Sequence, residues 1–217
     1  YGEMFKKKPF FIVFEGVEGC GKSFQSQKLF TNLKKKKINV ILTREPGGTK
    51  SSELIRNLIL KDYFTKNNNE KFDKYTDTLL YLAARNEHIK NKIKPALLKK
   101  KIVICDRFTD STLAYQVYGK KVDIKFINNI HKKILQGIKP DLVFILKVSK
   151  KSSRLRLKKR KTKNRYDNFS QSFYTNAQKS FIKLAKKKKN YFVIDSSSND
   201  SSLENKIYNI VNRYLKI

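Results

Sequence analysis

Short segments that are almost continuously apolar alternate along the chain with longer segments in which apolar residues recur at helical spacing. The short segments predict β-strands over residues 9–14, 39–43, 102–105, 141–147 and 191–194. The periodic segments predict helices over residues 23–35, 51–60, 73–94, 124–137, 149–159, 168–186 and 202–215. Because strands that are apolar on both faces need cover on both faces, this pattern predicts an α/β fold, with a parallel sheet between two layers of helices.

The chain is expected to form a single domain over residues 1–217, since no segment rich in Pro, Gly or Ser divides it. No run approaches the roughly 20 apolar residues of a membrane span, and no secretory signal is visible, so we expect no membrane association and a cytoplasmic location. The two cysteines fit a reducing compartment better than a disulfide framework. Met4 resembles a native start, which would make Tyr1 to Glu3 a cloning remnant.

The formal net charge of +32 would attract any polyanion. Most of this charge is lysine in short runs at predicted helix ends and turns, in a chain that is also rich in Asn and Ile. We interpret it as compositional and expect no dedicated nucleic-acid partner. Arginine is scarce by comparison, and is expected where a planar, bidentate contact with phosphate or carboxylate is needed. The candidates are Arg44, Arg85, Arg107 and the arginines of residues 154–165, whereas Arg56 and Arg213 are expected to be surface residues on amphipathic helices.

A glycine-rich segment follows the first predicted strand and opens the first predicted helix, which is the context of a phosphate-binding P-loop. Its glycines let backbone N–H groups point at phosphate oxygens. Lys22 adds a charge near the β- and γ-phosphates, and the Ser23 hydroxyl can ligate Mg²⁺. We therefore expect a nucleoside triphosphate to bind at Gly16, Val17, Glu18, Gly19, Cys20, Gly21, Lys22 and Ser23.

Further polar residues follow the next strands, where ligands of parallel sheets bind. Arg44 and Glu45 precede a tight Pro-Gly-Gly turn, and Asp106 and Arg107 follow the third strand. An acid at this place can lie near Mg²⁺ and the P-loop lysine, although a strand-end Asp can also cap the next helix. Hydrogen-bonding side chains suited to a nucleobase or sugar follow on about one helical turn: Ser111, Thr112, Tyr115 and Gln116.

Two more segments allow either a functional or a structural interpretation. Tyr81 and Arg85 lie four residues apart on one helix face, so the tyrosine could stack on a base beside the arginine or be a core residue. Residues 154–167 form the most basic segment. They could be a lid that closes over ATP or a solvated lysine-rich turn.

Taken together, residues 15–23, 43–48, 80–85, 106–108 and 111–116 resemble, in order, the motifs of the thymidylate kinase family. The resemblance implies a P-loop NTPase-type fold like that of nucleoside monophosphate kinases, with a five-stranded parallel sheet, usually in a homodimer. It implies transfer of the ATP γ-phosphate to dTMP, with Mg²⁺ as cofactor.

The resemblance also implies roles for individual residues. Lys22 and Ser23 match the contacts to ATP phosphates and Mg²⁺, and Asp106 matches the acid that supports them. Lys22, Glu18 and Arg107 would be catalytic. Arg44 and Arg107 would bind the acceptor phosphate, Arg85 and Gln116 would read the thymine edge, and Tyr81 takes the place of a stacking aromatic that is usually Phe. The acceptor would thus contact Glu18, Arg44, Tyr81, Arg85, Arg107, Ser111, Thr112, Tyr115 and Gln116.

In this family a catalytic arginine comes from either the P-loop or the lid. The P-loop position here holds Gly19, so the chain resembles the bacterial type, with Arg160 and Arg165 as catalytic candidates in a lid over about 154–167. The usual lid pattern Asp-Arg-x-Glu reads Asn164, Arg165, Tyr166, Asp167 here, so the lid is expected to close with different contacts.

Other functions are less favoured. A deoxynucleoside kinase or another P-loop phosphotransferase remains an alternative, but a deoxynucleoside is a neutral acceptor that needs a base, whereas Arg44 with Arg107 favours an anionic acceptor. A basic nucleic-acid-binding ATPase would use the net charge instead. A GTPase is disfavoured because no Asn-Lys-x-Asp segment is present.

Overall fold

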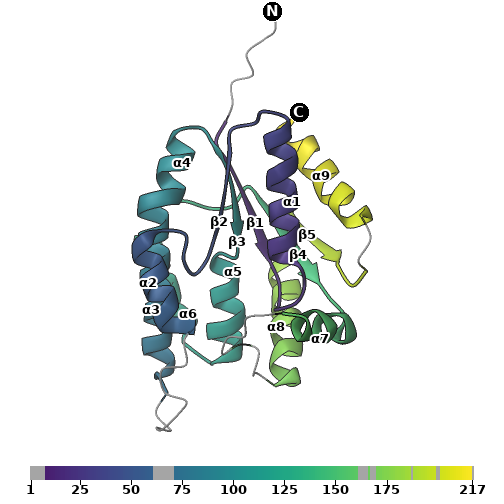
Figure 1. Ribbon diagram of the computed structural model, residues 1–217. Coiled ribbons are helices and arrows are strands. Elements are labelled where there is room, and N and C mark those ends of the chain that lie inside the picture. Colours follow the sequence, from purple (N-terminus) through teal and green to yellow (C-terminus); the bar gives the residue numbers. More distant parts are fainter. Residues whose placement is uncertain are drawn as a thin grey trace, which may run out of the picture.

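Five parallel strands form one sheet in the computed structural model, which describes residues 8–60, 71–160, 166, 170–186, 188–198 and 201–216. In spatial order the strands are β2, β3, β1, β4 and β5 (Figure 1). Every pair is parallel, which confirms the predicted fold class. Their bounds are Phe10–Glu15 for β1, Val40–Arg44 for β2, Ile102–Asp106 for β3, Leu142–Lys147 for β4 and Tyr191–Asp195 for β5.

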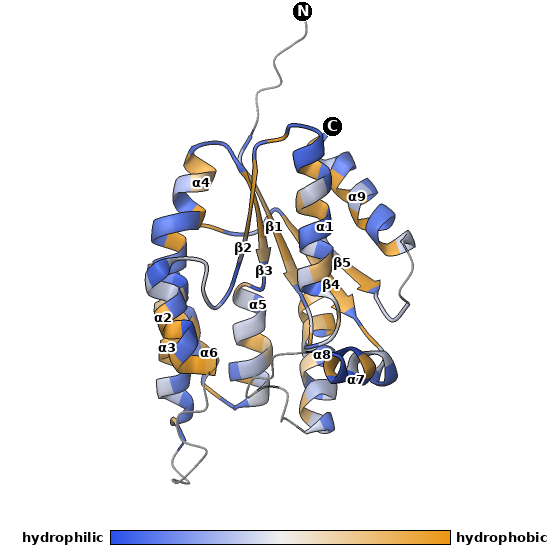
Figure 2. Cartoon of the chain, in the orientation of Figure 1, coloured by the Kyte–Doolittle hydropathy of each residue, from blue (hydrophilic) through white to orange (hydrophobic). Residues whose placement is uncertain are grey.

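The central strands form the core because their side chains are apolar on both faces. All residues of β1 after Phe10 are buried, as are Leu142 to Leu146 of β4. The Phe14 and Phe144 rings stack with centroids 5.1 Å apart. Figure 2 shows these strands as the most hydrophobic part of the interior. Burial of such continuous runs stabilises the sheet by roughly 25 cal/mol per Å² of apolar surface.

Helices cover both faces of this sheet (Figure 1). On one face α1 packs against α9, while α4 and α8 contact β3 and β4 on the other. This division follows from the right-handed crossovers between parallel strands. The bounds of these and the other long helices are Lys22–Lys35 for α1, Lys50–Leu60 for α2, Lys74–His88 for α3, Lys94–Leu98 for α4, Ile124–Leu135 for α6, Lys150–Lys158 for α7, Gln171–Ala185 for α8 and Ser202–Leu215 for α9.

The helix predicted over residues 73–94 is longer than expected. It begins at α3, where the Asp73 carboxylate accepts a hydrogen bond of 2.7 Å from the backbone N–H of Tyr75. It then passes through the π-helical segment η1 (Ile89–Ile93) into α4. Pro95 lacks an N–H and its ring crowds the preceding turn, which explains why the turns before it are widened.

One helical segment was predicted only as a single turn. The short helix α5 (Thr109–Thr112) continues into the π-helical segment η2 (Leu113–Gly119). Its buried residues are of both types, polar (Asp110, Ser111, Thr112 and Gln116) and apolar (Ala114 and Tyr115), because one face packs on the core and another faces the cleft. An amphipathic periodicity is therefore missing, which is why the pattern of apolar positions did not reveal it.

Candidate active site

The carboxyl ends of β1, β2 and β3 meet at one edge of the sheet, as predicted. Phe14 and Arg44 are both register partners of Asp106, so the residues that follow these strands are neighbours. They line a cleft of about 620 Å³. The predicted site residues that line it are Glu18, Gly19, Gly21, Lys22, Ser23, Arg44, Tyr81, Arg85, Asp106, Arg107, Ser111, Thr112, Tyr115, Gln116 and Arg160.

The P-loop wraps around the Lys22 ammonium group. Lys22 Nζ donates to the Val17 carbonyl at 2.9 Å and lies 3.5 Å from Cys20 Sγ. The Ser23 hydroxyl donates to Asp106 Oδ2, which joins the first turn of α1 to the end of β3. Of the predicted P-loop contacts, Gly16, Val17 and Cys20 are buried behind the cleft wall, so they could offer a ligand only their backbone.

Arg107 connects the P-loop to the α5–η2 side of the cleft. Its guanidinium donates to Glu18 Oε1 at 2.7 Å and to the Gly16 carbonyl at 3.0 Å, while Tyr115 donates to the other oxygen of Glu18 at 2.7 Å. Burial alone would raise the pKa of Glu18, but the charges of Arg107 and Lys22 outweigh it and hold this pKa below its usual value. Arg107 has a φ of 74°, an uncommon backbone conformation that concentrates at functional sites.

Glu15, at the end of β1, lies behind this cluster. Its carboxylate accepts from the Phe108 N–H at 2.7 Å and from the Ser111 hydroxyl at 2.6 Å. Ser111 Oγ in turn accepts from Arg107 at 3.1 Å, so Ser111 links Glu15 to the arginine. Burial and the nearby Asp110 raise the pKa of Glu15 to about 8. The one signal of this role in the sequence is an acidic residue at the end of an apolar strand.

The opposite wall is built around Arg85 of α3, whose side chain is only 3% exposed. Its guanidinium donates to Glu45 at 2.7 Å, to Thr112 at 2.7 Å and to the Phe108 carbonyl at 2.8 Å. Gln116 also faces the cleft, and its buried Nε2 has no hydrogen-bond partner among the described residues. This wall therefore presents hydrogen-bond donors to a ligand.

Arg44 of β2 and Arg56 of α2 both line the cleft. Arg44, mostly exposed, donates from Nη2 to both carboxylate oxygens of Glu53 of α2, at 3.1 and 3.2 Å. Arg56 was expected to be a surface residue, and that prediction is wrong: it lines the cleft and donates to the Pro46 carbonyl at 2.6 Å. The polar face of α2 turns towards the cleft as well as to solvent, so amphipathic spacing alone could not distinguish a cleft residue from a surface residue.

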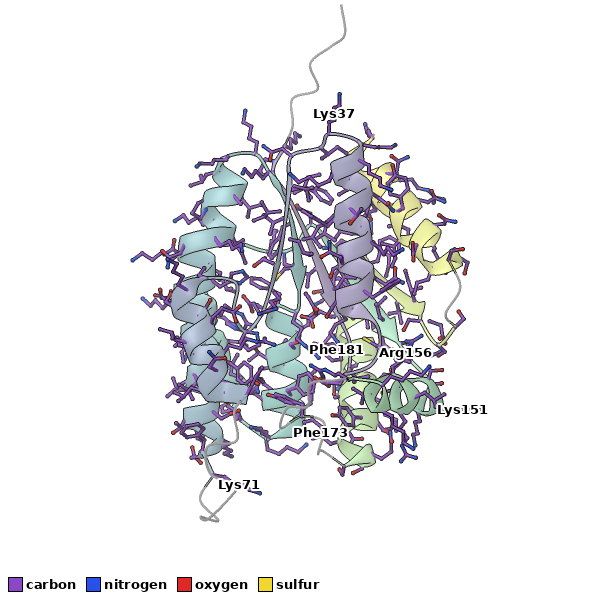
Figure 3. The ribbon with its side chains drawn as sticks, in the orientation of Figure 1. Lys37, Lys71, Lys151, Arg156, Phe173 and Phe181 are labelled. Carbon is purple, nitrogen blue, oxygen red and sulfur yellow. The ribbon has the colours of Figure 1, made fainter. Side chains whose placement is uncertain are left out.

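The arginines of the basic segment 154–165 have different surroundings. Arg154 donates to Gln171 and does not line the cleft. Arg156 was a candidate only as one of the arginines of this segment, with no role of its own. It donates to the Gly19 carbonyl at 3.2 Å and to the Ser196 carbonyl at 2.6 Å, and lies at the inner part of α7 while Lys151 lies at its outer part (Figure 3). Arg160 is exposed and lines the cleft.

Part of the predicted lid lies outside the described residues, Arg165 included. Tyr166 is described and buried. Its hydroxyl contacts the hydroxyl of Tyr81, and its ring packs edge-on against Tyr115 with centroids 5.6 Å apart. Tyr81 is thus a half-buried side chain that packs against the core and also lines the cleft, and its stacking on a base stays a prediction.

Gly19 leaves no room for a side chain. Its φ is +73°, and an added Cβ would lie 2.8 Å from the Ser153 carbonyl oxygen of α7. Because that oxygen belongs to helix backbone, it cannot give way cheaply. The P-loop of this chain therefore cannot supply an arginine at this position.

The described residues limit how a metal could bind. They contain no group of three His, Cys, Asp or Glu side chains placed to hold an ion. Ser23 and Asp106 could hold a magnesium ion only with phosphate oxygens and water as its remaining ligands, which is the usual mode for Mg²⁺ at nucleotide sites. Within the described ranges, no helix combines the length and hydrophobicity that crossing a membrane requires.

Comparison with known proteins agrees with this geometry. The sequence profile of the family described as "Thymidylate kinase" matches residues 14–207. The chain is 42% identical to the thymidylate kinase of Aster yellows witches'-broom phytoplasma, over 95% of this chain and 96% of that protein. It is 40% identical to that of Prochlorococcus marinus, over 91% and 92%. A crystal structure of thymidylate kinase from Ehrlichia chaffeensis superposes with a TM-score of 0.72 at 34% identity, covering 96% of this chain and 99% of that one. The chain therefore belongs to the thymidylate kinase family, and its reaction is the transfer of a phosphoryl group from ATP to dTMP.

Proposed function

We propose that the P-loop holds the ATP phosphates and that dTMP occupies the part of the cleft between α3 and the α5–η2 segment, with Arg107 between the two. The position of Arg107 is the observation that carries this proposal. It contacts the P-loop through Gly16 and Glu18 and the acceptor side through Ser111. A guanidinium there can neutralise the acceptor phosphate and bring it into line with the donor.

The reaction needs positioning and charge neutralisation more than proton transfer. The attacking atom is an oxygen of a phosphate that is already anionic, so no general base is required. Two polyanions must be brought together, and fixed positive charges lower that barrier. In this proposal Lys22 neutralises the donor phosphates and Arg107 the acceptor. Arg160 would neutralise the migrating group, because Gly19 leaves the P-loop without an arginine.

Mg²⁺ fits the residues at the end of β3. Asp106 Oδ1 is buried and has no hydrogen-bond partner among the described residues, while Oδ2 accepts from the Ser23 hydroxyl. An unpaired buried carboxylate oxygen beside a hydroxyl is a donor set that a hard cation prefers. Ser23 and Asp106 would hold the ion, which would supply charge neutralisation at the ATP phosphates.

Gln116 supports the assignment of the acceptor base to this wall. A buried amide N–H without a partner costs free energy unless a ligand or water pairs with it. A pyrimidine carbonyl oxygen is such a partner, and Thr112 and Tyr115 lie on the same short helical segment. We therefore assign Gln116 to the edge of the thymine base.

Replacing Gln116 with leucine tests this assignment. The variant removes the amide at similar size, so we expect the KM for dTMP to rise about tenfold or more while kcat changes less than about threefold. Steady-state kinetics with each substrate varied would measure both constants. The control is Val117→Ala, because Val117 is half-buried on the same segment and does not line the cleft. An unchanged KM for dTMP in Gln116→Leu would refute the base-reading role.

We also propose that the chain forms a homodimer through α2 and α3. Leu54 and Leu58 of α2 and Leu79 of α3 are 72%, 40% and 47% exposed, on two helices that pack against each other. Tyr75 of α3 extends this apolar surface and contacts Phe126 of α6 edge-on at 5.3 Å. Contiguous exposed apolar side chains of this kind are typical of an interface between subunits.

A charge placed in this surface should separate the subunits. We expect wild-type protein to have twice the mass of one chain in light-scattering chromatography, and Leu54→Glu to shift to the mass of one chain. Leu98→Glu is the matched control, since Leu98 is 74% exposed on α4 and lies outside the surface. A monomeric wild type, or a dimer that Leu54→Glu leaves intact, would contradict the proposed interface.

A cytoplasmic location is proposed as well. It is supported by the substrates, which are nucleotides, and by Cys20 and Cys105, which are both buried free thiols.

A further inference from the structure

The chain contains two histidines, and both touch the ion pair between Glu45 and Arg85. His88 Nδ1 lies 3.1 Å from Glu45 Oε1, and His131 Nε2 lies 2.8 Å from Arg85 Nη1. His88 is fully buried and His131 is 7% exposed. His131 belongs to α6, an element that supplies no residue to the lining of the cleft.

Arg85 has five N–H groups, and its contacts use four of them. Nε donates to Glu45 and one Nη2 hydrogen donates to the Phe108 carbonyl. The two Nη1 hydrogens are divided between Thr112 and His131. Among the residues that the structure describes, one Nη2 hydrogen has no partner, and it belongs to a side chain that lines the cleft. Arg85 can therefore offer a ligand a single donor, whose direction is set by the other four contacts.

The contact also fixes the state of His131. A guanidinium has no acceptor, so His131 Nε2 must carry the lone pair and the proton must be on Nδ1. A protonated ring would place a second positive charge and a second donor against Arg85. Burial and the charge of Arg85 accordingly lower the pKa of His131 to about 3, only partly opposed by Glu45.

We infer that His131 is a positioning residue for the acceptor base: as a neutral hydrogen-bond acceptor it holds the Arg85 guanidinium so that the free N–H meets a carbonyl oxygen of the base. This rests on the proposed placement of dTMP. Without His131 one Nη1 hydrogen would be a buried donor with no partner. The guanidinium can satisfy it only by turning, which moves the remaining N–H away from the base. A purely structural role would lower stability without changing which base is preferred.

The test compares three variants of α6. His131→Leu removes the acceptor, His131→Asn restores one through its amide oxygen, and Ile127→Val is a packing control one turn earlier on the same buried face. For His131→Leu we expect the KM for dTMP to rise about tenfold with kcat and the KM for ATP within about twofold. The preference for dTMP over dCMP, which presents an amino group, should fall by a similar factor. His131→Asn should recover most of both effects, and Ile127→Val should show neither.

A measurement on wild-type protein supplies an independent test, even if His131→Leu does not fold. With only two histidines, ¹⁵N NMR of the imidazoles can be assigned by comparison with His131→Asn. We expect the His131 signals of a neutral ring protonated on Nδ1, unchanged from pH 8 to pH 5. A ring protonated on Nε2, or a folded His131→Leu with wild-type KM and base preference, would overturn the inference. Failure of wild-type enzyme to use dTMP would instead refute the proposed function.

Discussion

Replacing Arg160 with alanine is expected to lower kcat about 10³-fold while the KM for dTMP changes little, by analogy with arginine fingers in phosphoryl transfer. Arg160 follows α7 and lines the cleft, where Lys22 lies at the base of the P-loop. Gly19 cannot carry a side chain because α7 backbone occupies that space. We therefore propose that an arginine of the segment after α7 neutralises the migrating phosphoryl group. An interaction made mainly in the transition state affects kcat and leaves ground-state binding nearly unchanged.

Two further variants make this prediction specific. Arg154→Ala removes an arginine of α7, the helix before Arg160. Arg154 contacts Gln171 and does not line the cleft, so the kcat of this variant should stay within about twofold of wild type. Arg165→Ala tests the second candidate of the lid, which lies outside the described residues. Single-turnover measurements would separate phosphoryl transfer from product release. Wild-type turnover in both Arg160→Ala and Arg165→Ala would contradict the assignment of the catalytic arginine to the lid.

Replacing Arg107 with alanine should have an effect as large as that of Arg160→Ala, but on kcat/KM for dTMP rather than on kcat alone. We expect kcat/KM for dTMP to fall about 10³-fold or more, with a large part of the loss in KM. Arg107 is the partner of Glu18 at 2.7 Å and is held by the Gly16 carbonyl and Ser111. Removing it would take away the proposed contact to the acceptor phosphate. It would also leave buried Glu18 with only the charge of Lys22 to offset its own, which is costly in itself.

Arg107→Lys separates these two effects. Lysine keeps the charge near Glu18 but cannot make two parallel contacts, so stability should recover more than activity. Thermal unfolding would measure the recovery of stability, and steady-state kinetics would measure the recovery of activity. Arg213→Ala on α9, an exposed site, is the control for loss of an arginine elsewhere. If Arg107→Ala bound dTMP as tightly as wild type does, Arg107 would not be a phosphate ligand.

Much of the fold could be predicted from the sequence because its strands are buried on both faces. In continuous apolar runs such as β1 and β4, the change from apolar to polar residues shows where the strand ends. Because the carboxyl ends of parallel strands lie at the same edge of the sheet, the residues that follow them can be predicted to be neighbours. The P-loop was predictable for the same reason, since glycines and Lys22 have fixed roles at fixed spacing. Helix α5 and segment η2 were less clear, because a helix buried on several sides loses the periodicity that reveals it.

The residues that sequence reasoning missed are those whose role depends on distant contacts. In the sequence, Arg56 cannot be distinguished from other basic residues on amphipathic helices. Only the structure shows that it contacts the Pro46 carbonyl and lines the cleft. Arg156 was predicted only as one arginine of a basic segment, and its contact with the Ser196 carbonyl, 40 residues away, could not be predicted. His131 contacts Arg85 across 46 residues. The local sequence pattern carries no information on such pairings. The scarcity of arginine was used as a signal, whereas the equally informative fact that the chain has only two histidines was not.

The central claim is that this cleft transfers phosphate from ATP to the phosphate of dTMP. The most direct measurement is an ATP-consumption assay with purified wild-type protein and Mg²⁺, run in parallel with dTMP, dUMP, dCMP, AMP, GMP and thymidine. We expect rapid formation of ADP and dTDP with dTMP, much slower turnover with dCMP, AMP and GMP, and none with thymidine, which lacks the phosphate that Arg107 is proposed to bind. Turnover with thymidine but not with dTMP would contradict the account.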